Sequence, residues 1–285
     1  RAEDTEAAAA YLEAAHVAAR ALRHDAALAL VRRGSELSAP REIRHALAAF
    51  EGDVARDLGD AHASAAAWER ALSLAAGDAE RCEAHIGLAA AHRLTSAVEA
   101  GMAALDAAEP LAGRLGAARE LARIAYLRGS FDFVRGDAAA CARDHERALK
   151  YAREAGDEAH EAQALSGIAD VLYAQGRMAS AHDAFAGCVE LCDRRGNLRF
   201  SLMNRCMIGI TGAYLCRLRE SLVAIDEARV AARDIGHRVA EVMTGECAGL
   251  VLVDAGLFRE AREPLEHSLA LARRIASRRF AALDL

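Results

Sequence analysis

The sequence is poor in lysine, proline and aromatic side chains, and this composition limits the fold classes and binding partners that we expect. Lys150 is its one lysine and it has three prolines. The 36 basic residues are outnumbered by 42 acidic ones spread along the whole length, so no basic face for nucleic acid is visible. Aromatic residues make up 5% of the chain although apolar residues make up 53%. Alanine therefore does most of the filling, which favours thin helices that approach one another closely.

Membrane spans, leaders and disulfide frameworks are also missing. No apolar run approaches the roughly 18 residues of a membrane-spanning helix, and no charged-then-apolar leader opens the chain. The seven cysteines are scattered, without a CxxC pair, so a disulfide framework is not expected. The arginine and alanine bias suggests a GC-rich bacterial genome. We expect a cytoplasmic bacterial protein with reduced thiols and no membrane contact.

One period governs the chain. The stretches "GRMASAHDAFAGCVE" and "GDAAACARDHERALK" align with two others, and two less obvious copies fall into the same register. Counted from one copy to the next, the steps are 37, 40, 40, 40 and 40 residues. The six repeat positions are Gly59, Ser96, Gly136, Gly176, Cys216 and Gly256. A second series lies about halfway between them, at Gly77, Gly116, Gly156, Gly196 and Gly236.

Each repeat reads as an antiparallel hairpin of two helices. Apolar residues recur at intervals of three and four residues, which is typical of a helix with one buried face. A glycine can end such a helix in the left-handed conformation. An Asp or Asn after the glycine can accept hydrogen bonds from the free N–H groups of the next helix. These predicted caps are Asp60, Asp78, Asp137, Asp157 and Asn197. No strand pattern is present.

The repeat also predicts its own packing. Small residues stand seven places before each repeat position and five and twelve places after it, whereas the ninth place after it is mostly bulky. Close helix crossings need small residues beside one large side chain that fills the gap. The bulky series is Trp68, Leu105, His145, Phe185, Ile225 and Leu265. Cys188 and Cys192 stand where other repeats have alanine or serine, so we interpret them as small packing residues rather than a metal or redox pair.

This pattern of small and bulky places in a helical hairpin resembles the tetratricopeptide repeat, over about residues 40–275. The resemblance implies an all-α fold, a right-handed α-α superhelix of antiparallel helical hairpins. We expect a degenerate N-terminal hairpin at 1–39, six hairpins at 40–276, and the start of a further repeat at 277–285. The opening stretch is similar to the segment that precedes the C-terminal repeats of large bacterial signalling ATPases of the STAND type, including LuxR-like activators and ATPase-linked nucleotide cyclases. That similarity implies a fragment whose nucleotide-binding and output domains lie outside this chain.

The sequence was also searched for catalytic and metal sites. There is no GxxxxGK[ST] loop, and "HEAQA" lacks the second histidine of a zinc-protease helix. Cys82 and His85 could touch one ion, but His92 lies about 10.5 Å further along the helix and cannot join them. We expect packing roles for His85 and His92 and a partly buried structural role for His145. No catalytic residue, metal or cofactor is predicted.

The resemblance implies a concave wall formed by the first helix of each hairpin, where a partner protein or peptide would bind. Carried onto this chain, the wall comprises Ile86, Arg93, Arg123, Tyr126, Phe133, Gln163, Asp170, Tyr173, Met203, Cys206, Tyr214, Glu246 and Asp254. Among the thiols, Cys206 is the better candidate for a function. The wall has no lysine, which argues against the lysine–asparagine clamp that some tetratricopeptide proteins use to bind a carboxylate. An alternative is that its apolar side chains, especially in 199–218, are simply buried.

Our hypothesis is a non-enzymatic, protein- or peptide-binding scaffold that serves as the regulatory or sensor region of a larger bacterial signalling protein. The alternatives are a free-standing scaffold or peptide-pheromone receptor, and an enzyme whose groups assemble across the groove. Self-association through exposed end faces is a further expectation.

Overall fold

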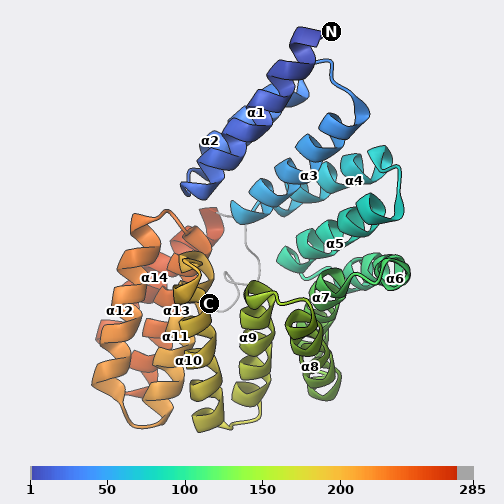
Figure 1. The fold of residues 1–285 in the computed structure, drawn as a ribbon. Coiled ribbons are helices and arrows are strands. Elements are labelled where there is room, and N and C mark those ends of the chain that lie inside the picture. Colours follow the sequence, from blue (N-terminus) through green and yellow to red (C-terminus); the bar gives the residue numbers. More distant parts are fainter. Residues whose placement is uncertain (1, 275–285) are drawn as a thin grey trace. The chain divides into compact units, whose positions relative to one another are not determined.

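The computed structural model describes residues 2–274, and all regular structure in that range is α-helical. None of the helices there is long and apolar enough to cross a membrane. The predicted all-α array of helical hairpins is confirmed. The helices are α1 (Ala2–Arg20), α2 (His24–Ser35), α3 (Arg41–Asp57), α4 (Ala61–Leu74), α5 (Asp78–Leu94), α6 (Val98–Leu115), α7 (Ala118–Arg135), α8 (Ala138–Glu154), α9 (Glu158–Ala174), α10 (Met178–Arg194), α11 (Leu198–Tyr214), α12 (Leu218–Asp234), α13 (Arg238–Asp254) and α14 (Phe258–Arg274) (Figure 1).

The chain divides into two compact units, with the boundary between Leu127 and Arg128 inside α7. In unit 1, α1 packs on α2, α3 on α4, and α5 on α6; in unit 2, α9 packs on α10, α11 on α12, and α13 on α14 (Figure 1). Odd-numbered helices are therefore the first helices of the hairpins. First helices also touch one another, α1 with α3 and α3 with α5 in unit 1, and α11 with α13 in unit 2. The expected further repeat at 277–285 lies outside the described residues.

The turn between the two helices of each hairpin uses a left-handed residue at every one of the six repeat positions. Four of these residues are glycines, with φ between 73° and 83°. The other two are Ser96 at φ 54° and Cys216 at φ 64°. Residues with a Cβ atom pay roughly 1–2 kcal/mol in this region, whereas glycine does not. Ser96 and Cys216 therefore adopt the left-handed backbone conformation of the turn although they are not glycine.

We expect Cys216→Gly to raise the free energy of unfolding by about 0.5–1 kcal/mol, because relief of the left-handed strain outweighs the added freedom of the unfolded chain. Urea unfolding followed by circular dichroism measures the change. Gly176→Ala introduces the same strain and should lower stability by a similar amount. Equal stability of all three proteins would show that these turns are not strained.

Four of the five predicted caps are confirmed. Asp60 accepts from the Ala63 amide, and Asp137, Asp157 and Asn197 accept from the corresponding amides of their helices. The prediction for Asp78 was wrong. That residue is already inside α5 and binds Arg114, while the backbone at Gly77 is extended rather than left-handed.

The bulky places are occupied as predicted, and four of them, Trp68, His145, Ile225 and Leu265, pack against a glycine of their own hairpin. A Cβ atom at Gly52 would lie 2.5 Å from the Trp68 ring, and one at Gly209 would lie 2.3 Å from Ile225. The neighbouring hairpin contributes too, which the pattern did not predict. A Cβ atom at Gly87 would lie 2.2 Å from Trp68. Trp68 is thus held between glycines of two successive first helices.

His145 repeats this arrangement in unit 2. Cβ atoms at Gly129 and Gly167 would lie 2.8 Å and 2.3 Å from its ring. The side chain is almost fully buried, which confirms the structural role expected for it. Burial lowers the pKa of His145 to about 4, so the folded protein holds a neutral imidazole at neutral pH.

Cys188 and Cys192 are both buried, packed against Ala162. The hydrogen bond with Cys192, together with burial, raises the pKa of the Cys188 thiol well above its usual value. The same hydrogen bond lowers the pKa of Cys192. The burial of both thiols against Ala162 confirms the interpretation of this pair as small packing residues.

Candidate functional site

The predicted wall residues of unit 1 lie on α5 and α7. Arg93, Arg123 and Tyr126 are each partly buried. Unit 1 also has an open groove of about 600 Å³ between α1 and α3, which the sequence did not indicate because α1 departs from the repeat pattern. The groove is lined by Ala9, Leu12, Glu13, His16, Arg20, Glu42, Ile43 and Ala46.

In unit 2 the predicted residues lie on α7, α9, α11 and α13. Phe133 and Tyr214 are exposed, with Tyr214 retaining 52% of its surface. Gln163, Asp170 and Tyr173 on α9 are partly buried, as is Met203 on α11. Each of these side chains is therefore at least partly accessible to solvent.

Three predicted wall residues were placed wrongly. Ile86 and Cys206 are fully buried and Glu246 nearly so. They share one register of the repeat, and in unit 2 this register lies where α11 packs against α13. Cys206 packs in one cluster with Cys247, and its thiol donates to the Met203 carbonyl. The exposed thiol among the seven is instead that of Cys216.

Two exposed apolar residues on α13 were missed. Leu250 retains 53% of its surface and Val253 retains 37%. Their positions follow Asp170 and Tyr173 by 80 residues, so the repeat register alone could have found them. We use the name unit 2 face for Tyr173, Met207, Tyr214, Met243, Leu250 and Val253, which lie on three successive first helices.

Two tyrosines join neighbouring hairpins on the unit 2 face. The ring centroids of Tyr173 and Tyr214 are 6.4 Å apart, and the ring planes are tilted by 54°. Burial, followed by the neighbouring Tyr214, raises the pKa of Tyr173 to about 12. Both Met207 and Met243 pack in the cluster that contains Tyr173. The face therefore offers aromatic rings, flexible thioethers and a neutral phenol at physiological pH.

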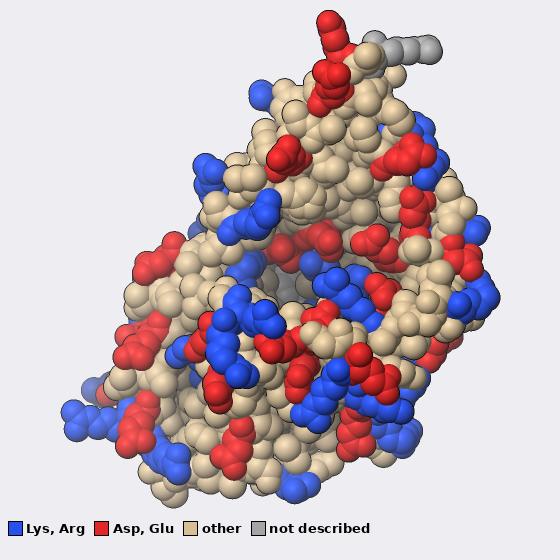
Figure 2. Space-filling view, in the orientation of Figure 1, with Lys and Arg blue, Asp and Glu red and all other residues tan. Residues whose placement is uncertain are grey.

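The helix segments that carry the unit 2 face are poor in charged residues. The segments 163–174, 206–214 and 243–254 contain no lysine, arginine or histidine. They contain three acids, Asp170, Glu246 and Asp254. Elsewhere the charges mix, and Figure 2 shows acidic and basic side chains interspersed on the side in view. The single-signed stretch is therefore a local property of α9, α11 and α13.

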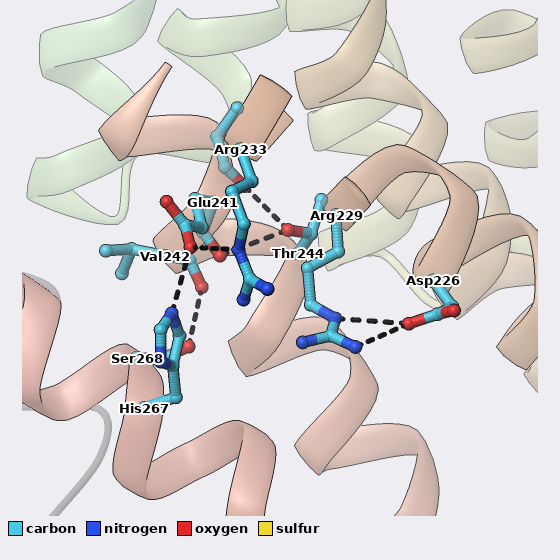
Figure 3. Close-up of polar contacts among 9 residues, drawn as sticks. Asp226, Arg229, Arg233, Glu241, Val242, Thr244, His267 and Ser268 are labelled. Carbon is cyan, nitrogen blue, oxygen red and sulfur yellow. Dashed lines mark hydrogen bonds and ion pairs between the residues drawn. The ribbon is translucent and has the colours of Figure 1, made fainter. Parts of the chain in front are cut away.

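A polar cluster around Glu241 joins three helices of unit 2 (Figure 3). Glu241 Oε1 accepts from Arg233 Nε at 3.1 Å and lies 2.9 Å from His267 Nε2. Burial alone would raise the pKa of Glu241, but the contacts with His267 and Arg233 outweigh it and lower the pKa. The nearby hydroxyls of Thr244 and Ser268 donate to backbone carbonyls. The arrangement ties α12, α13 and α14 together and leaves these hydroxyls engaged with the backbone.

The two candidate metal ligands on α5, Cys82 and His85, were examined for a shared contact. Cys82 is buried and donates to the Ala108 carbonyl, and burial lowers the pKa of His85. Within residues 2–274 the structure brings together no group of three or more histidine, cysteine or acidic residues that could hold a metal ion.

No known family model matches the sequence, and no curated protein matches it either. Solved structures do match the fold. A Rap protein complexed with competence and sporulation factor is 12% identical, with a TM-score of 0.64 over 98% of this chain and 95% of that one. Aspartyl phosphate phosphatase F from Bacillus subtilis is 12% identical, with a TM-score of 0.72 over 92% of this chain and 69% of that one.

A third match is a signal transduction ATPase with numerous domains (STAND) from Pyrococcus horikoshii, which carries a tetratricopeptide repeat sensor. It is 12% identical, and the match covers 91% of this chain and 41% of that one with a TM-score of 0.51. At these identities the matches establish a shared helical repeat fold.

Proposed function

Because the chain has a tetratricopeptide-like repeat fold, we propose that it binds a protein or peptide segment on its first helices and acts as a regulatory region in bacterial signal transduction. The observation that carries this proposal is the unit 2 face, where solvent-accessible apolar and aromatic side chains recur on α9, α11 and α13. Tyrosine is among the residues that most often carry binding energy. Repeat arrays commonly use such surfaces for extended partners.

The proposed setting is a larger signalling protein in the cytoplasm, in which a partner bound to the repeats biases a linked ATPase between two states. Such regulation requires a partner that binds one state more tightly than the other. The likeness to a STAND ATPase with a repeat sensor supports this setting.

A free-standing receptor is the second candidate. It is favoured by the Rap protein that was solved with a bound factor and that is matched over 95% of its length. The full-length gene separates the two candidates, since a Walker A motif upstream of Arg1 supports the ATPase setting and its absence supports the receptor.

In both settings we propose action by binding alone. The polar cluster that most resembles a catalytic centre lies around Glu241, and its side chains hold helices together. Turnover assays with phosphate esters and peptide substrates test this proposal, and saturable activity that is lost in Glu241→Gln would overturn it.

Replacing Tyr173 or Tyr214 with alanine is expected to weaken partner binding by about fivefold to thirtyfold each, because each substitution removes a large aromatic contact surface. Partners are captured from a lysate of the organism that encodes the chain, identified by mass spectrometry, and their affinities are measured with purified components.

Val230→Ala on α12 is the matched control, since Val230 retains 48% of its surface but lies on a second helix. Its affinity should equal that of the unaltered chain. Thermal unfolding of every variant separates lost binding from lost folding. Unchanged affinity in folded Tyr173→Ala and Tyr214→Ala proteins would place the partner elsewhere.

A further inference from the structure

We propose that two copies of this chain associate through α1, with α1 of one copy lying antiparallel to α1 of the other beside the groove between α1 and α2. This inference goes beyond the proposed function and does not depend on it. It follows from the apolar groove of the N-terminal hairpin, from the unpaired charges of α1 and from the order of those charges along the helix.

The N-terminal hairpin carries an apolar groove on its surface. Helix α1 packs on α2, and a groove between them has a volume of about 480 Å³. Its lining comes from these two helices and the turn that joins them, and comprises Ala10, Glu13, Ala14, Val17, Ala18, Arg23, Ala26 and Leu30. Val17 retains 51% of its surface there. Because the terminal hairpins of a repeat array need a polar outer face to stay soluble alone, an apolar groove at this end favours a cover.

The charged side chains of α1 are not paired within the chain. Glu6, Arg20 and Arg23 are exposed, and none of them makes an ion pair or a side-chain hydrogen bond with another residue in 2–274. By contrast, α12 pairs Arg229 with Asp226 at 2.6 Å, one turn apart. No arginine or lysine stands three or four places after an acid of α1, so that spacing cannot neutralise its charges. They are available to a second molecule.

The charges of α1 are also separated by sign. All acids of the helix lie at or before position 13, and all basic side chains of the helix and the following turn lie at or after position 16, namely Glu3, Asp4, Glu6 and Glu13 against His16, Arg20, Arg23 and His24. A parallel neighbour of the same sequence would bring like charges together, whereas an antiparallel neighbour brings opposite charges together. The dipoles of two antiparallel helices also attract each other. The charge order therefore fits a second copy of α1 that runs in the opposite direction.

One register aligns the charges and the groove together. When the two-fold axis passes beside Ala14, Glu6 of each copy lies opposite Arg23 of the other. Val17 of each copy then packs near Ala10 of the other, and the small side chain of Ala14 lets the two helices approach closely at the axis. Because the axis is two-fold, every contact is made twice.

Sedimentation equilibrium of the 285-residue chain tests the association. We expect the mass to rise from 30.3 kDa towards twice that value as the concentration increases over about 1–300 µM. Val17→Asp places two carboxylates in the contact and should weaken association at least about tenfold. Val223→Asp is the matched control, because Val223 retains 54% of its surface on α12, and it should leave association unchanged. Circular dichroism checks that each variant is folded.

Exchange of two charges tests the register. Glu6→Arg and Arg23→Glu each set like charges opposite one another twice, so each should weaken association by about fivefold or more. The doubly substituted chain again has opposite charges in contact and should regain most of the lost affinity. Losses that simply add in the double variant would overturn the pairing of Glu6 with Arg23.

Cysteine cross-linking tests the direction of the helices. In a chain whose exposed Cys216 is replaced by serine, Ala14→Cys should form a disulfide between two copies when the oxidant diamide is added. Ala2→Cys should not, since an antiparallel pair holds the two copies of position 2 about 36 Å apart. Efficient cross-linking through Ala2→Cys would show a parallel pair and overturn the inference.

Two further results would also overturn it. A mass that stays at 30.3 kDa over the whole concentration range shows that a second copy does not cover the groove, which would leave it to a different partner. Association that persists unchanged in Val17→Asp places the contact outside α1. These measurements need no partner protein, so they leave the proposed binding by the unit 2 face to be judged separately.

Discussion

Replacing Trp68 with alanine is expected to lower the free energy of unfolding of unit 1 by about 3–5 kcal/mol. The indole is fully buried and fills the space between Gly52 and Gly87, which have no side chains to close the resulting cavity. Urea unfolding followed by circular dichroism measures the loss, because the variant lacks the only tryptophan.

A substitution at Gly87 tests the same contact between Trp68 and the next first helix. A Cβ atom at Gly87 would lie 2.2 Å from the indole, so Gly87→Ala should cost about 1–3 kcal/mol by overpacking. Gly113→Ala is the matched control on α6, where nothing lies within 4 Å and alanine favours the helix. It should stabilise by up to about 1 kcal/mol. If Gly87→Ala behaved like Gly113→Ala, the close packing at Trp68 would be wrong.

Acid is expected to destabilise unit 2 through His145, beginning near pH 6.5 and so above the ordinary pKa values of carboxyl groups. The folded pKa of about 4 lies below the ordinary histidine value of 6.5, so the unfolded chain binds one more proton between these values. Stability therefore falls as the pH falls from 6.5 to 4, at roughly 1.4 kcal/mol per pH unit and by about 3 kcal/mol in all. Below pH 4 both states are protonated and this contribution is fully lost.

His145→Leu places the residue found at the same position in two other repeats, Leu105 and Leu265. The variant should lose most of the pH dependence between pH 6.5 and 4.5, measured as the urea midpoint at several pH values. His62→Leu, at an exposed position on α4, should keep it. A steep acid dependence that persists in His145→Leu would assign the effect to another group.

The period of the sequence predicted most of the architecture, because turns and close crossings each require a particular kind of residue. Ser96 and Cys216 were assigned to glycine positions by register alone, and both have left-handed φ. Contacts between hairpins were harder to predict. Gly87 and Gly167 carry no mark that distinguishes them from other helical glycines until the bulky ring of the preceding hairpin is seen against them.

The candidate site was predicted less well than the fold. Wall positions were taken from the resemblance, and three residues of one register, Ile86, Cys206 and Glu246, proved to be buried. Whether such a residue is exposed to solvent depends on the distance between neighbouring first helices. The spacing of residues in the sequence does not give that distance. Leu250 was overlooked although it shares a register with Asp170. The groove between α1 and α3 could not be predicted from the repeat, because the N-terminal hairpin lacks the repeat pattern.

The bulky side chain held between successive hairpins has a consequence for how such a gene can change. Trp68 needs glycine both in its own hairpin and in the next one, and so does His145. A recombination event that inserted or exchanged a whole hairpin would separate such a ring from its second glycine. The hairpins that carry Trp68 and His145 are therefore not interchangeable as units cut at the turns. A duplication that keeps either ring with both of its glycines has its ends within first helices.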